Sequence, residues 1–196
     1  MEIKRIDTYR DERFSQRVLR QHGCFLVDGV PCEVEIVSHS EAIIRGVGPQ
    51  AYGQVIENFR FYTPHITRFY DDDHVVVREY PPAQLLAIEL DRIQPSQFYV
   101  DEDKVRAIAS FIHKAEDIVI QVLPYGDRYI SLDGHTRLYY AVMQGWSQVR
   151  AVAETADDWG YRFVEEAKKR NVDTPADLGL LGHEEYEEKW NRFCDR

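Results

Sequence analysis

The sequence has few cysteines, no long apolar run and no basic segment, and each shortage argues against a class of protein. Cys24, Cys32 and Cys194 are too few and too scattered for a disulfide framework, and the lack of a C-x-x-C pair argues against structural zinc. No apolar run approaches the roughly 20 residues of a membrane helix. The charged N-terminus lacks the apolar stretch of a signal peptide. We therefore expect a cytoplasmic protein with no membrane partner.

Positive charge is also scarce. The formal net charge is -10 over 196 residues, and acidic residues outnumber basic ones in each of the stretches 1–80, 81–155 and 156–196. Proteins that bind DNA or RNA usually present a positive stripe to the phosphates. The charge distribution therefore argues against a nucleic acid as the partner.

Residues 1–82 predict a mixed region of strands and helices. The dipeptide Asp28-Gly29 stands between two alternating runs and predicts a tight hairpin. Cys24 and Cys32 flank this hairpin, which would allow the two thiols to face each other. Further elements are expected as helices near 11–22 and 49–62 and as strands near 41–46 and 74–80. We expect an N-terminal α+β lobe of unknown role.

Residues 83–155 have a clearer pattern, with the order β-α-β-β-α-β. Asp101 stands where a helix N-cap belongs, and apolar residues at helical spacing follow it. Leu138, Ala141 and Val142 mark the inner face of a second helix, and Gly145 suits the position just beyond its end. This region predicts a mixed sheet with packed helices.

Residues 156–196 predict two helices. The second helix places Tyr186, Trp190 and Phe193 on one face. Aromatic residues at this spacing usually belong to a core or a docking surface rather than to a ligand cage.

Residues 133–137, Asp-Gly-His-Thr-Arg, lie at a strand-to-helix junction and admit two interpretations. In the structural interpretation, Asp-Gly forms a turn, Thr136 caps the helix and Arg137 is a surface residue. In the functional one, Gly134 lets the backbone approach a phosphate, which the helix N–H groups and Arg137 then bind. His135 would donate to the phosphate or transfer a proton, and Asp133 would hold Mg²⁺ or act as a general base.

The stretch "ISLDGHTRLYYAVMQGWSQVRAV", preceded by "VDEDKVRAIASFI" and "IVIQVLPYGDRY", resembles the ParB/sulfiredoxin superfamily over roughly residues 86–153. The resemblance implies a ParB/sulfiredoxin-like mixed sheet within the α+β class. It also implies that the loop Leu-Asp-Gly-His-Thr-Arg cradles nucleotide phosphates, and that the helix beginning near Asp101 forms another wall of the site.

The loop residues separate the branches of this superfamily. Sulfiredoxins carry a nucleophilic cysteine in the loop, and this chain has none there. Partitioning ParB proteins carry an arginine-rich loop and a DNA-binding domain after it, whereas acidic residues predominate here. The loop is most similar to Asp-Gly-His-His-Arg of the free-serine kinases, with Thr136 in place of the second histidine. Those kinases also use a glutamate where this chain has Gln97, which cannot act as a base.

We therefore expect a ParB-like nucleotide-binding domain at 83–155, between the lobe at 1–82 and a C-terminal helical extension at 156–196. The expected partner is a small-molecule nucleotide, ATP, ADP or another. Phosphoryl transfer to a small hydroxyl-bearing acceptor is the expected activity, with Mg²⁺ as cofactor.

The expected site lies within the loop. Asp133 and His135 are the predicted catalytic residues, and Asp133 is the predicted Mg²⁺ ligand. Gly134, His135, Thr136 and Arg137 are the predicted phosphate-binding residues. Two alternatives stay open, a non-catalytic module that responds to a nucleotide and a DNA-associated ParB-like protein.

Overall fold

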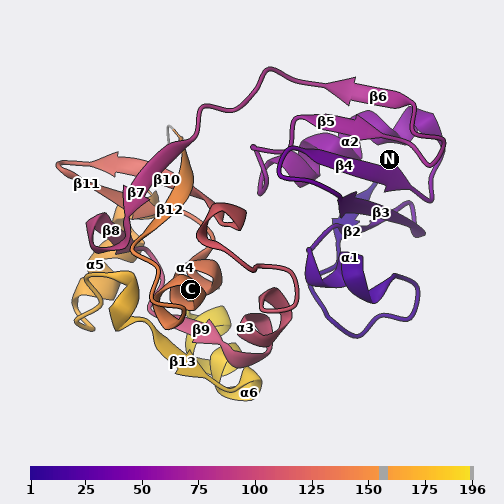
Figure 1. Cartoon of the computed structure of the whole chain (residues 1–196). Helices are drawn as coiled ribbons and strands as arrows, with labels where there is room; N and C mark the ends of the chain where they lie inside the picture. Colours follow the sequence, from indigo (N-terminus) through magenta and orange to yellow (C-terminus); the bar gives the residue numbers. More distant parts are fainter. Residues whose placement is uncertain (155–158, 195–196) are drawn as a thin grey trace. The chain divides into compact units, whose positions relative to one another are not determined.

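The computed structural model describes residues 1–154 and 159–194. The chain divides into two compact units, Met1–Ala83 and Gln84–Arg196 (Figure 1). Both units combine helices with strands, so the chain is an α+β protein. Within the described ranges, no helix is long and apolar enough to cross a membrane. The C-terminal segment, which we expected as an extension, is part of the second unit.

The first unit is built on a six-stranded sheet with the strands in chain order. Neighbouring strands are antiparallel except β4 and β5, which run parallel and are connected by the helix α2. The hairpin at Asp28-Gly29 is confirmed, because both residues have a positive φ between the paired strands β2 and β3. The elements are β1 (Ile3–Arg5), α1 (Gln16–Arg20), β2 (Cys24–Val27), β3 (Val30–Ile36), β4 (Glu41–Arg45), α2 (Pro49–Arg60), β5 (Arg68–Tyr70) and β6 (Val76–Glu79).

The two faces of this sheet pack against different apolar clusters, and each cysteine of the hairpin belongs to a different one of these clusters. Cys24 packs with Val18 and Leu19 of α1, whereas Cys32 belongs to the larger cluster that includes Phe59 of α2. The reason is the register, because Cys32 pairs with Phe25 and successive residues of a strand point to opposite faces. The expectation that the two thiols face each other is therefore wrong.

The second unit has a five-stranded sheet in the order β7-β12-β10-β11-β8. The pairs β10–β12 and β11–β8 are parallel, and the pairs β12–β7 and β10–β11 are antiparallel. The elements up to its last strand are β7 (Leu86–Glu89), the 3₁₀ turn η1 (Leu90–Arg92), β8 (Ile93–Pro95), β9 (Tyr99–Asp101), α3 (Glu102–Ile108), η2 (Ala115–Asp117), β10 (Val119–Tyr125), β11 (Arg128–Ser131), α4 (His135–Met143) and β12 (Gln148–Ala153).

This sheet is curled. Its two edge strands, β7 and β8, are joined only by the short turn η1. The Cα atoms of Glu89 and Ile93 can therefore be at most about 15 Å apart. A flat sheet of this strand order would separate its edges by about 19 Å. The curl encloses an apolar core formed by both the sheet and α4, with Ile120, Leu138 and Ala151 fully buried.

The C-terminal segment completes the second unit. Its elements are α5 (Trp159–Lys168), the 3₁₀ turn η3 (Pro175–Asp177), β13 (Gly179–Leu181), α6 (His183–Tyr186), the π-helical turn η4 (Glu187–Asn191) and α7 (Arg192–Cys194). The start of the first expected helix, at 157–158, lies outside the described residues. Strand β13 pairs in parallel with β9. Tyr186 and Trp190 pack against Phe98, which confirms the predicted aromatic face as core.

The aromatic cluster generates a stability prediction. Phe98 is 2% exposed and contacts the rings of Trp190 and Phe193 edge-on, at centroid distances of 4.9 and 5.2 Å. We expect Phe98→Ala to lower the free energy of unfolding of the second unit by about 3–5 kcal/mol. Urea unfolding followed by tryptophan fluorescence measures this unit, because all three tryptophans lie in it. Leu180→Ala, at an exposed position of β13, is the control and should cost less than about 1 kcal/mol.

Candidate functional site

The candidate site lies where two parallel strands of the curled sheet end. Strands β8 and β11 pair with Pro95 opposite Ser131, so the segments that follow them leave the same edge of the sheet. The segment after β8 begins with Ser96, and the segment after β11 is the loop 132–134 that leads into α4. Open α/β sheets commonly bind ligands at the carboxyl ends of parallel strands. The expected loop therefore occupies a favourable position in the fold.

A buried polar network joins these two segments. The Ser96 N–H donates to Nε2 of His135 at 3.2 Å, and the Ser96 hydroxyl donates to the Ser131 carbonyl at 2.7 Å. The Ser131 hydroxyl lies 3.0 Å from the same Nε2. All three side chains are buried, with exposures of 6% or less. Satisfied buried networks of this kind fix a single geometry, so the loop backbone is held in place before any ligand arrives.

The network also fixes the protonation state of His135. A backbone N–H can only donate, so Nε2 must be an acceptor and the ring proton sits on Nδ1. Burial lowers the pKa of His135 to about 4, and this effect exceeds the opposing influences of the Asp133 charge and of a hydrogen bond with the Ser131 backbone. The imidazole is therefore neutral at pH 7 and acts in positioning the loop.

The helix α4 begins at this network, because His135 is its first residue. Its N-cap is Gly134, which adopts a left-handed conformation with φ +81°, and no described side chain caps the helix. The first helical hydrogen bond runs from the Leu138 N–H to the Gly134 carbonyl, so the three preceding N–H groups have no acceptor within the helix. Thr136 is therefore not the cap, contrary to the structural interpretation of the sequence. Thr136 lies instead inside the first turn of α4.

Arg137 does not extend into solvent but folds back beneath the loop. Its guanidinium donates through Nη1 to the Val119 carbonyl at 2.5 Å and through Nη2 to the Asp133 carboxylate at 2.8 Å. The guanidinium also lies against Gly134, where an added Cβ would come within 3.1 Å of its nitrogens. The Arg137 side chain is 21% exposed and that of Asp133 is 42% exposed. The pair thus places a fixed positive charge and a partly accessible carboxylate at the start of α4.

The five predicted site residues are consecutive and lie at this junction, whereas the side-chain amide of Gln97 is bonded to groups outside it. The Gln97 amide donates to the Tyr99 carbonyl and to the Tyr186 hydroxyl, the latter at 3.2 Å. Sequence reasoning missed Ser96 and Ser131, which hold His135. A serine after a short strand is a weak signal, and only the parallel pairing of β8 with β11 shows that it meets the loop.

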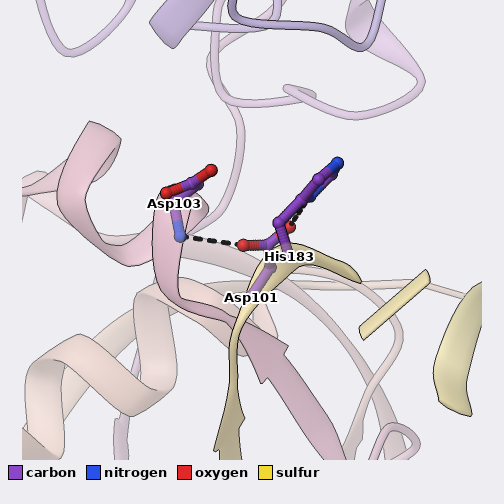
Figure 2. Close-up of side chains that lie close together, drawn as sticks. All are labelled: Asp101, Asp103 and His183. Atoms are coloured by element: carbon purple, nitrogen blue, oxygen red, sulfur yellow. Dashed lines mark hydrogen bonds and ion pairs between the residues drawn. The ribbon is translucent and has the colours of Figure 1, made fainter. Parts of the chain in front are cut away.

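A second group of side chains could hold a cation. The carboxylates of Asp101 and Asp103 and the imidazole of His183 each offer an atom, and these atoms lie within 4.8 Å of one another (Figure 2). Asp101 is the N-cap of α3, as predicted, and its Oδ1 accepts from the Asp103 N–H at 2.8 Å. The hydrogen bond to Asp101 raises the pKa of His183.

The position of Gly134 gives a prediction for the loop. A Cβ there would lie 2.6 Å from Cγ2 of Ile120, and φ is positive as well. We expect Gly134→Ala to destabilise the second unit by about 2–4 kcal/mol, through both steric overlap and backbone strain. Gly145→Ala is the matched control at the other end of α4, where φ is +70° but nothing lies within 4 Å. Urea unfolding should show a loss of only about 1 kcal/mol for it; equal losses would mean that the overlap is relieved without cost.

The buried imidazole predicts a pH dependence. The pKa of His135 is about 4 in the folded protein and 6.5 ordinarily, so the unfolded chain binds more protons between these values. The contribution of His135 to stability is complete above pH 6.5 and is lost as the pH falls toward 4, by about 3 kcal/mol in total. Urea unfolding across this range should show a smaller loss in His135→Gln. An NMR titration that places the wild-type ring near pH 6.5 would contradict the assignment.

Comparison with known proteins assigns no family. No protein-family model matches the chain, and no curated protein matches it. Among solved structures, the crystal structure of protein Atu1540 from Agrobacterium tumefaciens is similar, with 18% sequence identity and a TM-score of 0.36. The match covers 50% of this chain and 62% of that one, so this chain spans less than two thirds of the length of its structural neighbour.

Proposed function

We propose that the second unit is a nucleotide-binding domain of the ParB/sulfiredoxin type, and that the loop 133–137 binds the nucleotide phosphates. The observation that carries this proposal is the start of α4, where N–H groups without a helical acceptor stand beside Arg137 on a rigid base. The N-terminus of a helix attracts anions because its N–H groups and its dipole both favour negative charge. Among phosphate-bearing ligands, we choose a nucleotide because of the sequence resemblance to the ParB/sulfiredoxin superfamily.

Arg137 would bind the phosphate by exchanging one partner. Its Nη1 is held by the Val119 carbonyl, and its Nη2 is paired with Asp133 in the present structure. A phosphate oxygen at the helix start would replace the Asp133 carboxylate at Nη2, since both are anionic acceptors of similar geometry. Gly134 and Thr136 would contribute backbone N–H groups and close approach to the same ligand.

Asp133 would then be the catalytic residue of the loop. Once Arg137 turns to the phosphate, the Asp133 carboxylate would hold Mg²⁺ on the nucleotide or accept the proton of an acceptor hydroxyl. Transfer of the terminal phosphoryl group of ATP to a small hydroxyl-bearing acceptor is the proposed reaction, with ADP as the other product. Catalysis of this type depends mainly on positioning and charge neutralisation. His135, which is neutral and 6% exposed, would contribute by positioning the loop.

A non-catalytic module that responds to a nucleotide is the second candidate. It is favoured by Gln97, which stands where the free-serine kinases use a glutamate and whose amide is bonded to Tyr186. In this case the protein would bind the nucleotide without turning it over, and the exchange of partners at Arg137 would be the whole response.

The test is a calorimetric titration of the full chain with ATP, ADP, CTP and GTP, with and without Mg²⁺. We expect saturable binding of at least one nucleotide and a loss of about 10- to 100-fold in affinity for Arg137→Ala, as one charge-assisted hydrogen bond is removed. Arg192→Ala, an exposed arginine of α7, is the control and should leave the affinity unchanged. Wild-type affinity in Arg137→Ala would contradict the proposed phosphate site.

Binding and activity measurements on a variant of Asp133 distinguish the two candidate functions. In Asp133→Asn we expect binding to persist while the dependence on Mg²⁺ and any phosphoryl transfer decline. Product should be sought by following ADP release with a panel of small hydroxyl compounds. Saturable binding without product for every acceptor would support the non-catalytic module.

A further inference from the structure

The pair of parallel strands β9 and β13 brings together three potential metal ligands from distant parts of the sequence. Asp101 ends β9 and pairs with Leu181, the last residue of β13. A helix starts after each strand, so Asp103 of α3 and His183 of α6 lie beside Asp101 (Figure 2). Their ligand atoms are within 4.8 Å of one another, a separation that modest side-chain rotations would close around an ion.

Asp101 is unusual among these residues because its carboxylate is 1% exposed. A buried charge is costly unless it is compensated. Its Oδ2 is paired with Nδ1 of His183 at 2.8 Å, and its Oδ1 accepts the Asp103 N–H. The histidine side chain is 57% exposed, so the cluster opens to solvent on this side. A rigid, buried anionic ligand beside an accessible imidazole is a suitable base for a metal ion with an entry path.

We propose that Asp101, Asp103 and His183 form a site for a divalent first-row transition metal ion, with Mn²⁺ and Zn²⁺ as the best matches. One imidazole nitrogen and two carboxylate oxygens favour these ions over Mg²⁺ and Ca²⁺, which prefer oxygen ligands alone. The ion would replace the hydrogen bond between Asp101 and His183 in the present pairing. Three protein ligands leave at least one position open for water or a substrate oxygen.

The ion pair of Asp103 with Arg106 does not prevent Asp103 from binding the metal ion. The Asp103 carboxylate contacts Nη1 of Arg106 at 3.1 Å, whereas Nη2 of the same arginine is bonded to Glu102. Arg106 therefore keeps a partner when Asp103 turns toward the ion. Both ion pairs are exposed, and such pairs contribute little to stability.

The proposal is independent of nucleotide binding and is tested in its absence. Chelator-treated full-length protein is titrated with Mn²⁺, and the free ion is followed by its electron paramagnetic resonance signal; Zn²⁺ is then added as a competitor. We expect one equivalent of Mn²⁺ to bind, to be displaced by Zn²⁺, and to bind about tenfold or more weakly in His183→Gln and in Asp101→Asn. Asparagine is an effective N-cap, so Asp101→Asn should keep α3 intact.

Two controls separate this site from others. His113→Gln and Asp91→Asn remove an exposed histidine and an exposed aspartate of the same unit and should leave Mn²⁺ affinity unchanged. Arg137→Ala should also leave it unchanged, so that failure of the phosphate site and failure of the metal site can be told apart. The absence of saturable Mn²⁺ binding, or equal affinity in wild type and His183→Gln, would overturn the proposal.

Discussion

The contact between Ser96 and His135 is the interaction on which the candidate site depends. It ties the segment after β8 to the loop after β11, and both partners are buried. An imidazole can accept this hydrogen bond only while it is neutral, and burial keeps it neutral. The loop backbone and the start of α4 therefore rest on a support whose geometry is set before a ligand binds. His135, one of the two residues predicted to be catalytic, thus forms part of the support of the loop.

The sequence predicted the local elements well where the signal lies in neighbouring residues. The Asp28-Gly29 hairpin, the N-cap Asp101 and the buried face of α4 with Leu138 and Ala141 all follow from turn chemistry and helical spacing. The β-α-β-β-α-β order of the second unit is present, although its first strand is divided into β7 and β8 on opposite edges of the sheet. That division depends on the curl of the sheet, which is a property of all five strands together.

What the sequence could not predict depends on contacts between distant segments. Strands β9 and β13 have three residues each, too few for an alternating pattern, and they pair across about 80 positions of the chain. The separation of Cys24 from Cys32 is an exception, because the two-residue turn at Asp28-Gly29 already pairs Cys32 with Phe25 and not with Cys24. The folded-back Arg137 depends on the Val119 carbonyl, a backbone group that every residue carries and that no motif can mark.

The pairing of β9 with β13 has a consequence for biosynthesis. The six-stranded sheet of the first unit is complete once residue 83 has been made, so this unit can form while the rest of the chain is still being translated. The second unit cannot form at that stage. Phe98 and Val100 are buried by strand β13 and the aromatic residues after it, so they stay exposed until residues 179–193 have left the ribosome. Its nascent form exposes an apolar surface during most of its synthesis, and this interval is when it would most need a chaperone.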